Sequence, residues 1–282
     1  MKNLVYSLIT LFVFSSCNIG DFVDQSTSVI IEDKKKQSKF DKFLERKFVS
    51  TYNVDLIYKY VDVETDFDFR LVPATYQNSI RIANLINYLC LEPFNKIAPK
   101  DFLKKYFPKQ ILLVGSAGYY NNGTKVLGTA EGGVKITLFE INNLDITDID
   151  KLNSLDFRTI YHEFAHILHQ NIDYTKDFDA ISDIDYVGGS WSSNWGRNNP
   201  SNVAGFVSNY SSKEANEDFV EIIAFYLSHK QPAWNQIIER AGKNGGAKIS
   251  RKLELVKNYM QKVWSIDLEK LRDEIQLRSD NL

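Results

Sequence analysis

Three of the chain's four histidines fall in one twelve-residue stretch, TIYHEFAHILHQ, at residues 159–170. His162 and His166 are four residues apart and Glu163 follows the first, so the stretch reads H-E-x-x-H. On a helix this spacing puts both imidazoles on one face, where they can bind the same ion. Zinc accepts imidazole nitrogen and can keep one position open for water, from which a neighbouring glutamate removes a proton. The pattern predicts a catalytic Zn²⁺ site with His162 and His166 as ligands and Glu163 as general base.

The alternative is a core helix whose histidines are satisfied by hydrogen bonds alone. The motif does have apolar neighbours, at Phe157, Ile160, Phe164, Ile167 and Leu168. Two imidazoles and a carboxylate side by side in apolar surroundings are costly to bury without a metal or hydrogen-bond partners. We therefore favour the metal site.

His169 suggests a site with three histidines, but the helix geometry argues against it. On a straight helix His162 and His169 lie about 10 Å apart along the axis, so one zinc ion cannot bind His162, His166 and His169 together. The Gly and third His of the metzincin pattern are also missing after the motif. His169 is then a residue that supports the site from behind, a pocket residue, or a helix-end histidine favoured by the helix dipole.

A third ligand must come from another part of the chain. The stretch YSSKEANEDFVEIIAFYL, at residues 210–227, offers Glu214, Glu217 and Glu221. Glu217 and Glu221 share a helix face, so one can bind zinc while the other supports a ligating histidine. A solvated surface is the usual place for a helical glutamate, but the apolar neighbours here indicate a buried helix.

The elements that must position these residues are mixed. The chain has 282 residues, with 44% hydrophobic residues, 25% charged residues and a net charge of -2, which is typical of a globular protein. The basic residues are scattered along the chain, so the sequence does not indicate a nucleic-acid partner. Apolar periodicity predicts helices at 39–53, 76–94, 149–171, 213–229, 234–244 and 248–276, and strands at 54–63, 108–120 and 132–141, with a turn at 121–124. The fold class expected is α+β, with a mainly helical C-terminal half.

Residues 172–209 form a long polar segment without a regular pattern, and segments of this kind are commonly functional. Its aromatic residues include Tyr186, Trp191 and Trp195. These side chains either shape the pocket or a lid, or pack the segment onto the body of the protein. We expect packing for at least half of them.

The N-terminal stretch MKNLVYSLITLFVFSSC has the pattern of a secretory signal, because a short apolar run follows one lysine. Two serines directly before Cys17 resemble a bacterial lipoprotein box, although Phe14 stands where leucine is usual. We expect a signal peptide at 1–16, a lipidated Cys17, a flexible tether at 17–37 and a single domain at 38–282. An ordinary signal peptide is the alternative. Cys90 then has no disulfide partner and is expected to be a buried apolar residue.

The motif and the downstream glutamates resemble the gluzincin class of metallopeptidases. HEFAHILHQ together with NEDFVE, DYVGGSW and GFVSNYSSKEANEDFVEIIAFYL resembles the zinc metallopeptidases known as substrate-import-associated zinc metallohydrolase lipoproteins. The resemblance covers most of the chain after the tether. It implies a zincin-like domain with a small mixed sheet, a lipid anchor in the outer membrane on either face, and an association with TonB-dependent nutrient-import proteins.

A remoter resemblance, to anthrax lethal factor and its relatives, implies the remaining roles. Their E-F-F-A-E run matches EDFVE at residues 217–221, with Asp218 in place of the first phenylalanine. This match implies that Glu217 is the zinc ligand and Glu221 the helper glutamate. The catalytic tyrosine of those proteins, seven residues before the ligand, falls on Tyr210.

The function expected is therefore that of a zinc-dependent hydrolase, most simply a peptidase acting on a peptide or protein substrate. The strand at 132–141 is expected to be an edge strand that pairs with extended substrate, or else an ordinary inner strand. Two other functions fit the same residues: a surface lipoprotein that binds a nutrient and keeps zinc for structure, and a zinc hydrolase of a non-peptide amide or ester. Glu163 argues against a purely structural site, because such a site needs no base.

Overall fold

The computed structural model describes residues 37–61, 64–65, 69–119, 125–126, 128–131, 134–153, 157–197 and 200–282, with the backbone alone at 125–126, 128–131 and 150. The predicted signal peptide, Cys17, the predicted tether up to residue 36 and the predicted turn at 121–124 lie outside these ranges. Ser38–Leu282 form one unit by their internal contacts. In the described ranges, no helix has both the length and the apolar character needed to cross a membrane.

The central sheet has four strands in the order β1-β2-β6-β5. The strands β1 (Asp55–Ile57), β2 (Gln110–Leu113) and β6 (Lys135–Leu138) are parallel, and β5 (Gly128–Glu131) runs antiparallel to β6. In the register, Leu56 lies opposite Ile111, which lies opposite Ile136. All three side chains are buried, so they form one apolar row across the parallel part of the sheet. A separate two-stranded pair joins β3 (Gly118–Tyr119) and β4 (Lys125–Val126).

The predicted edge strand at 132–141 is wrong, because β6 pairs with β2 on one side and with β5 on the other. The edge belongs to β5, whose sequence GTAE has none of the apolar alternation by which a strand is recognised. Ile136 and Leu138 are buried, as expected for an inner strand.

Two long helical stretches precede and follow β1. The first comprises α2 (Lys39–Leu44), the π-helical turn η2 (Glu45–Val49) and α3 (Ser50–Tyr52), and Ser38 and Asp41 cap it reciprocally. The second comprises α4 (Tyr76–Ile86), η4 (Asn87–Leu91) and α5 (Glu92–Ile97), which Thr75 caps. A short helix, α6 (Phe102–Tyr106), then leads into β2.

The helix predicted over 149–171 appears as two described helices, α7 (Ile149–Leu152) and α8 (Arg158–Asn171). Asp148 caps α7 by accepting a hydrogen bond from the Lys151 amide at 2.9 Å. The Tyr161 hydroxyl donates to the Leu89 carbonyl at 3.0 Å, and the Phe164 ring packs edge-on against Phe107. These contacts fix the rotation of α8, so that the histidine face turns away from the aromatic core.

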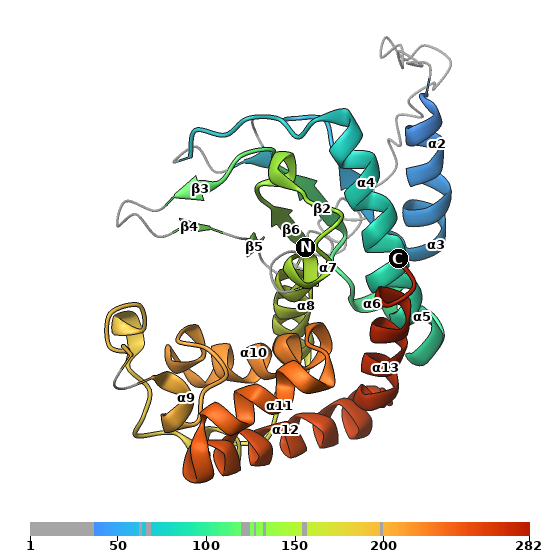
Figure 1. The fold of residues 1–282 in the computed structure, drawn as a ribbon. Coiled ribbons are helices and arrows are strands. Elements are labelled where there is room, and N and C mark those ends of the chain that lie inside the picture. Colours follow the sequence, from blue (N-terminus) through green and yellow to red (C-terminus); the bar gives the residue numbers. More distant parts are fainter. Residues whose placement is uncertain are drawn as a thin grey trace, which may run out of the picture. The chain divides into compact units, whose positions relative to one another are not determined.

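From Ala215 onward the chain consists of helices. They are α10 (Ala215–Ser228), α11 (Gln231–Arg240), α12 (Gly242–Trp264) and α13 (Leu268–Ser279). The single helix predicted over 248–276 is wrong in one respect, because Ser265 takes a left-handed conformation with φ 56° and separates α12 from α13. In Figure 1, α8 stands between the strands and α10, and it packs against β5, β6 and α10. Since nearly all of α10 is buried, its glutamates face protein and not solvent.

The segment 172–209 is tied to α10 and to the short helix η9 (Tyr210–Ser212). The ring of Tyr174 stacks on Phe219 with centroids 4.0 Å apart. The Trp195 indole N–H donates to the Ser212 hydroxyl at 2.7 Å. These contacts hold the segment against α10 and η9.

A buried ion pair between α12 and α10 also anchors this segment. Lys252 of α12 lies 2.5 Å from Asp218 of α10, and both side chains are completely buried. The Lys252 ammonium also donates to the Gly205 carbonyl at 2.8 Å, and the Tyr186 hydroxyl donates to Asp218 at 3.0 Å. A buried charge pair of this kind is tolerated because further hydrogen bonds engage both charged groups, although Oδ1 of Asp218 has no hydrogen-bond partner among the described residues.

The start of α12 depends on a close backbone approach. A Cβ atom at Gly245 would lie 2.2 Å from the Asn202 carbonyl oxygen and 2.8 Å from that of Val203, at the short helix α9 (Ser201–Ala204). We expect Gly245→Ala to lower the free energy of unfolding by about 1–3 kcal/mol, the usual cost of overpacking. Chemical denaturation would measure this loss. Gly196→Ala is the matched control, because no atom lies within 4 Å of its added Cβ, and equal stability of the two variants would contradict the prediction.

Candidate metal centre

Three side chains from two helices converge on one point. His162 and His166 come from α8, and Glu217 comes from the first turn of α10. The two Nε2 atoms are 3.2 Å apart, and each lies 3.2 Å from Oε2 of Glu217. Among the described residues, these three form the group that could hold a metal ion. The structure thus brings together the two histidines of the motif and one of the three glutamates considered.

The donor triangle fits zinc. Bonds of about 2.0–2.1 Å in a tetrahedral site place ligand atoms about 3.3–3.4 Å apart, close to the 3.2 Å edges here. Two imidazole nitrogens and one carboxylate oxygen also suit zinc better than calcium or magnesium, which prefer sets of oxygen ligands. Three protein ligands leave the fourth tetrahedral position for water or substrate, as in catalytic zinc sites.

His162 is oriented by Glu221, one turn after the ligand on α10. Its Nδ1 lies 2.9 Å from Oε1 of Glu221, and the other oxygen of Glu221 accepts a hydrogen bond from Ser208 at 2.6 Å. A proton on Nδ1 leaves the lone pair on Nε2, so this contact selects the tautomer that binds metal. Burial opposes a charge on His162, but hydrogen bonds to Glu217 and Glu221 outweigh it and raise its pKa to about 10. On binding, a zinc ion would displace the proton on Nε2 and leave the one on Nδ1 in place.

His166 is oriented by His169. Nδ1 of His166 lies 3.0 Å from Nε2 of His169, so His169 stands behind the ligand and does not join the donor triangle. Burial, and then the nearby His166, lower the pKa of His169 to about 4, which keeps its imidazole neutral and able to accept a proton. The two ligands therefore differ in their support, with a carboxylate behind His162 and a neutral imidazole behind His166.

The second oxygen of Glu217 has two donors of its own. The Tyr210 hydroxyl donates to Oε1 at 2.8 Å, and the Lys213 ammonium donates to the same atom at 2.7 Å. Burial opposes ionisation of Glu217, but hydrogen bonds from both histidines and Lys213 hold its pKa well below the usual range. Burial raises the pKa of Tyr210, so its hydroxyl remains a donor. Trp191 packs edge-on against the Tyr210 ring with centroids 5.0 Å apart.

Glu163 is the one carboxylate of the motif that is not among the donors. It lies beside His162 on α8 and is partly exposed. Burial raises its pKa above the usual value for glutamate, against the lowering effect of the two histidines. A partly exposed carboxylate of raised pKa beside a metal centre has the basicity that a general base requires.

Sequence reasoning missed Ser208 and Lys213. Serines are common in polar segments, and Ser208 carries no spacing signal that connects it to Glu221. Lys213 does carry a signal, since it lies four residues before Glu217, but that spacing is usually an ordinary surface pair. The contact between His166 and His169 agrees with their i,i+3 spacing on one helix.

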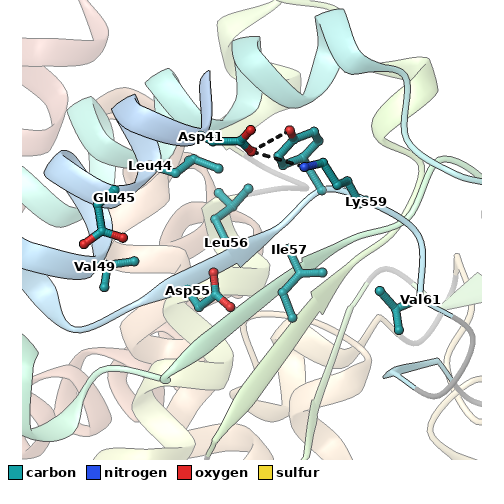
Figure 2. Close-up of a pocket in the computed structure, with 10 residues that line it drawn as sticks. Asp41, Leu44, Glu45, Val49, Asp55, Leu56, Ile57, Lys59 and Val61 are labelled. Atoms are coloured by element: carbon teal, nitrogen blue, oxygen red, sulfur yellow. Dashed lines mark hydrogen bonds and ion pairs between the residues drawn. The ribbon is translucent and has the colours of Figure 1, made fainter. Parts of the chain in front are cut away.

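A pocket lies beside β1, at the end of the sheet opposite β5. Figure 2 shows this pocket, of about 270 Å³, between α2, η2 and β1. The Asp41 carboxylate accepts hydrogen bonds from the Tyr58 hydroxyl and from Lys59. Burial opposes its charge, but hydrogen bonds from Ser38, Tyr58 and Lys59 outweigh this and lower the pKa of Asp41 to about 2. Asp41, Tyr58 and Lys59 are thus engaged with one another, and none of the metal-centre residues lines the pocket.

A known protein family and a solved structure are similar to this chain. A family model described as "putative zinc-binding metallo-peptidase" matches residues 32–269. A crystal structure of a "putative zinc-binding metallo-peptidase" from Bacteroides caccae ATCC 43185 has a TM-score of 0.75 and 35% sequence identity, and the match covers 87% of this chain and 95% of that chain. Among curated proteins, none matches. The fold is that of a zinc-binding metallopeptidase.

The chain belongs to this family of zinc-binding metallopeptidases, since the family model matches well over half of its length. The predictions of a zinc metallopeptidase family and of Zn²⁺ as the cofactor are confirmed.

Zinc should stabilise the folded protein measurably. A ligand that binds only the native state, at a free concentration 1,000 times its Kd, adds about 4 kcal/mol to the free energy of unfolding. For a domain of this size, that gain raises Tm by roughly 8–16 °C. Thermal unfolding of the metal-free protein, with and without added zinc, measures the shift. Magnesium at the same concentration is the control. An equal shift of Tm with both ions would contradict a site whose two imidazole nitrogens select zinc.

Proposed function

We propose that the protein is a zinc-dependent peptidase with the gluzincin arrangement of ligands. The observation that carries this proposal is the 3.2 Å triangle of His162, His166 and Glu217 beside a carboxylate that is not a ligand. A structural zinc site is normally closed by four protein ligands and has no use for a base of raised pKa. The open position and Glu163 therefore favour hydrolysis over simple binding.

The chemistry follows from the residues around this triangle. Zinc, when bound, supplies the positive charge that polarises the scissile carbonyl and acidifies the attacking water. Glu163 takes the proton of that water and passes it to the leaving amine. Glu221 and His169 hold the two imidazoles in the orientation that directs both Nε2 atoms to the metal.

Tyr210 is the proposed donor to the oxyanion of the transition state. Its ring lies 5.8 Å from that of His162, and its hydroxyl donates to Glu217. A short rotation of this side chain would carry the hydroxyl from Glu217 toward a substrate oxygen at the centre. A preorganised donor of this kind contributes roughly 3–4 kcal/mol to transition-state stabilisation.

The substrate would bind in extended form along β5. This strand lies at the end of the sheet order, and α8 packs against it. An extended peptide can add to such an edge through main-chain hydrogen bonds, which are independent of its sequence. In this arrangement β5, and not the inner strand β6, is the edge that binds the substrate.

A cleavage screen tests the peptidase activity. The zinc-loaded protein would be incubated with a broad peptide library, and the products identified by mass spectrometry, with Glu163→Gln as the parallel sample. We expect cleavage by the wild type and at least about 100-fold slower cleavage by the variant. Hydrolysis of ester or non-peptide amide substrates alone would show instead a zinc hydrolase of another class, and turnover of none of them would contradict catalysis.

We also propose that Cys17 is lipidated, that the protein is anchored in the outer membrane, and that it works beside nutrient-import proteins there. Support comes from the sequence alone, through the two serines before Cys17 and the likeness to import-associated lipoproteins. Membrane fractionation should place the wild type in the outer membrane and release Cys17→Ala, or block its maturation. An unchanged distribution would contradict the lipid anchor.

A further inference from the structure

Lys213 has a place at the metal centre that neither the H-E-x-x-H motif nor the peptidase chemistry assigns. It follows η9 and lies four residues before the ligand Glu217. Its ammonium lies 2.7 Å from Oε1 of Glu217, 5.3 Å from the centre of the Tyr210 ring and 3.4 Å from the exposed Glu214. About a third of the Lys213 side chain is exposed, whereas Glu217 is nearly fully buried.

The two oxygens of Glu217 have separate tasks. Oε2 belongs to the donor triangle, and Oε1 accepts hydrogen bonds from Tyr210 and Lys213. A buried carboxylate oxygen that loses its donors is costly, because no water replaces them. One strong charge-assisted donor is enough to satisfy this oxygen and to hold Oε2 toward the metal.

We propose that Lys213 is a positioning residue that holds Oε1 of Glu217 and thereby frees the Tyr210 hydroxyl to leave it. With Lys213 present, Tyr210 can turn to the substrate oxyanion while Glu217 stays satisfied and in place. Without Lys213, Tyr210 is the remaining donor and is retained on Glu217. The part that concerns the oxyanion rests on the proposed peptidase function, and the part that concerns Glu217 does not.

Zinc affinity tests the shared role without any need for activity. Because either donor can hold Oε1, Lys213→Met and Tyr210→Phe should each raise the zinc Kd by no more than about fivefold, and the double variant by about 100-fold or more, as for a ligand that has lost its outer support. Lys213→Arg should stay close to the wild type. Lys243→Met removes a positive charge from the exposed side of α12 and is the matched control. The proposal would be overturned if the increase in zinc Kd of the double variant equalled the product of the increases of the two single variants.

Kinetics test the release of Tyr210. In the wild type, Tyr210→Phe should lower kcat by about 10²–10³-fold, the usual loss of an oxyanion donor. With zinc held well above the raised Kd of the double variant, the same substitution in the Lys213→Met background should lower kcat by less than about tenfold, with KM little changed, because Tyr210 is already held on Glu217. An equal loss of kcat in both backgrounds would contradict the release of Tyr210 from Glu217. If the wild type turns over no substrate, the proposed function fails, and the zinc measurements still decide the role of Lys213.

Discussion

Glu163→Gln is expected to lower kcat/KM by roughly 10²–10⁴-fold, the range in which a general base contributes, while the zinc content stays unchanged. Glutamine keeps the size and shape of the side chain but cannot take a proton from water. Glu163 is not one of the three converging donors, so its replacement leaves the triangle intact. The measurement pairs steady-state kinetics on a cleaved peptide with zinc content by atomic emission.

Two results would contradict this assignment of Glu163. Full activity in the zinc-loaded variant would show that another group takes the proton. A parallel loss of zinc would show that Glu163 supports the metal and does not act as a base. Glu239→Gln, on the exposed end of α11, is the matched control and should leave kinetics and zinc unchanged.

Glu217→Ala is expected to have the largest effect on the metal itself. Structural zinc sites bind with about 10–16 kcal/mol, so one of three protein ligands accounts for roughly 3–5 kcal/mol, or about 10²–10⁴-fold in Kd. The variant also leaves two imidazoles facing each other with no anion between them. Competition with a chromophoric chelator measures the Kd of each variant.

The neighbouring glutamates make the test of Glu217 discriminating. Glu214→Ala, at the exposed start of α10, should leave the zinc Kd unchanged. Glu221→Ala removes the partner of His162 and should raise the Kd by about 10–100-fold, less than the loss of a ligand. Equal effects at Glu217 and Glu221 would mean that the two carboxylates share the metal.

The centre was predictable where a helix alone sets the geometry. His162 and His166 share a face because four residues make about one turn, and the same rule excludes His169 from the ion. The choice among Glu214, Glu217 and Glu221 was beyond this rule, since it depends on how α10 is rotated against α8. Ser208 reaches Glu221 only through the path of the segment before η9, which local periodicity does not encode.

The fold was predictable where the apolar pattern is long. The stretches at 39–52 and 76–97 are helical as expected, and the expected small mixed sheet is present. The edge strand β5 was missed because a strand at the end of a sheet needs no alternation when only its backbone pairs with β6. The break at Ser265 was missed because a left-handed residue other than glycine or asparagine is uncommon.

The contacts that tie the segment 172–209 to α10 have a consequence for the route by which metal enters. His166 and Glu217 are 51 residues apart, and closing a loop of that length in a free chain costs about 3.5 kcal/mol of entropy before any contact is made. In this protein, stacking of Tyr174 on Phe219 and the hydrogen bond from Tyr186 to Asp218 close the loop without the metal. Zinc therefore meets ligands that are already assembled. Its uptake should be a single bimolecular step, and its loss should leave the chain folded and ready to be loaded again.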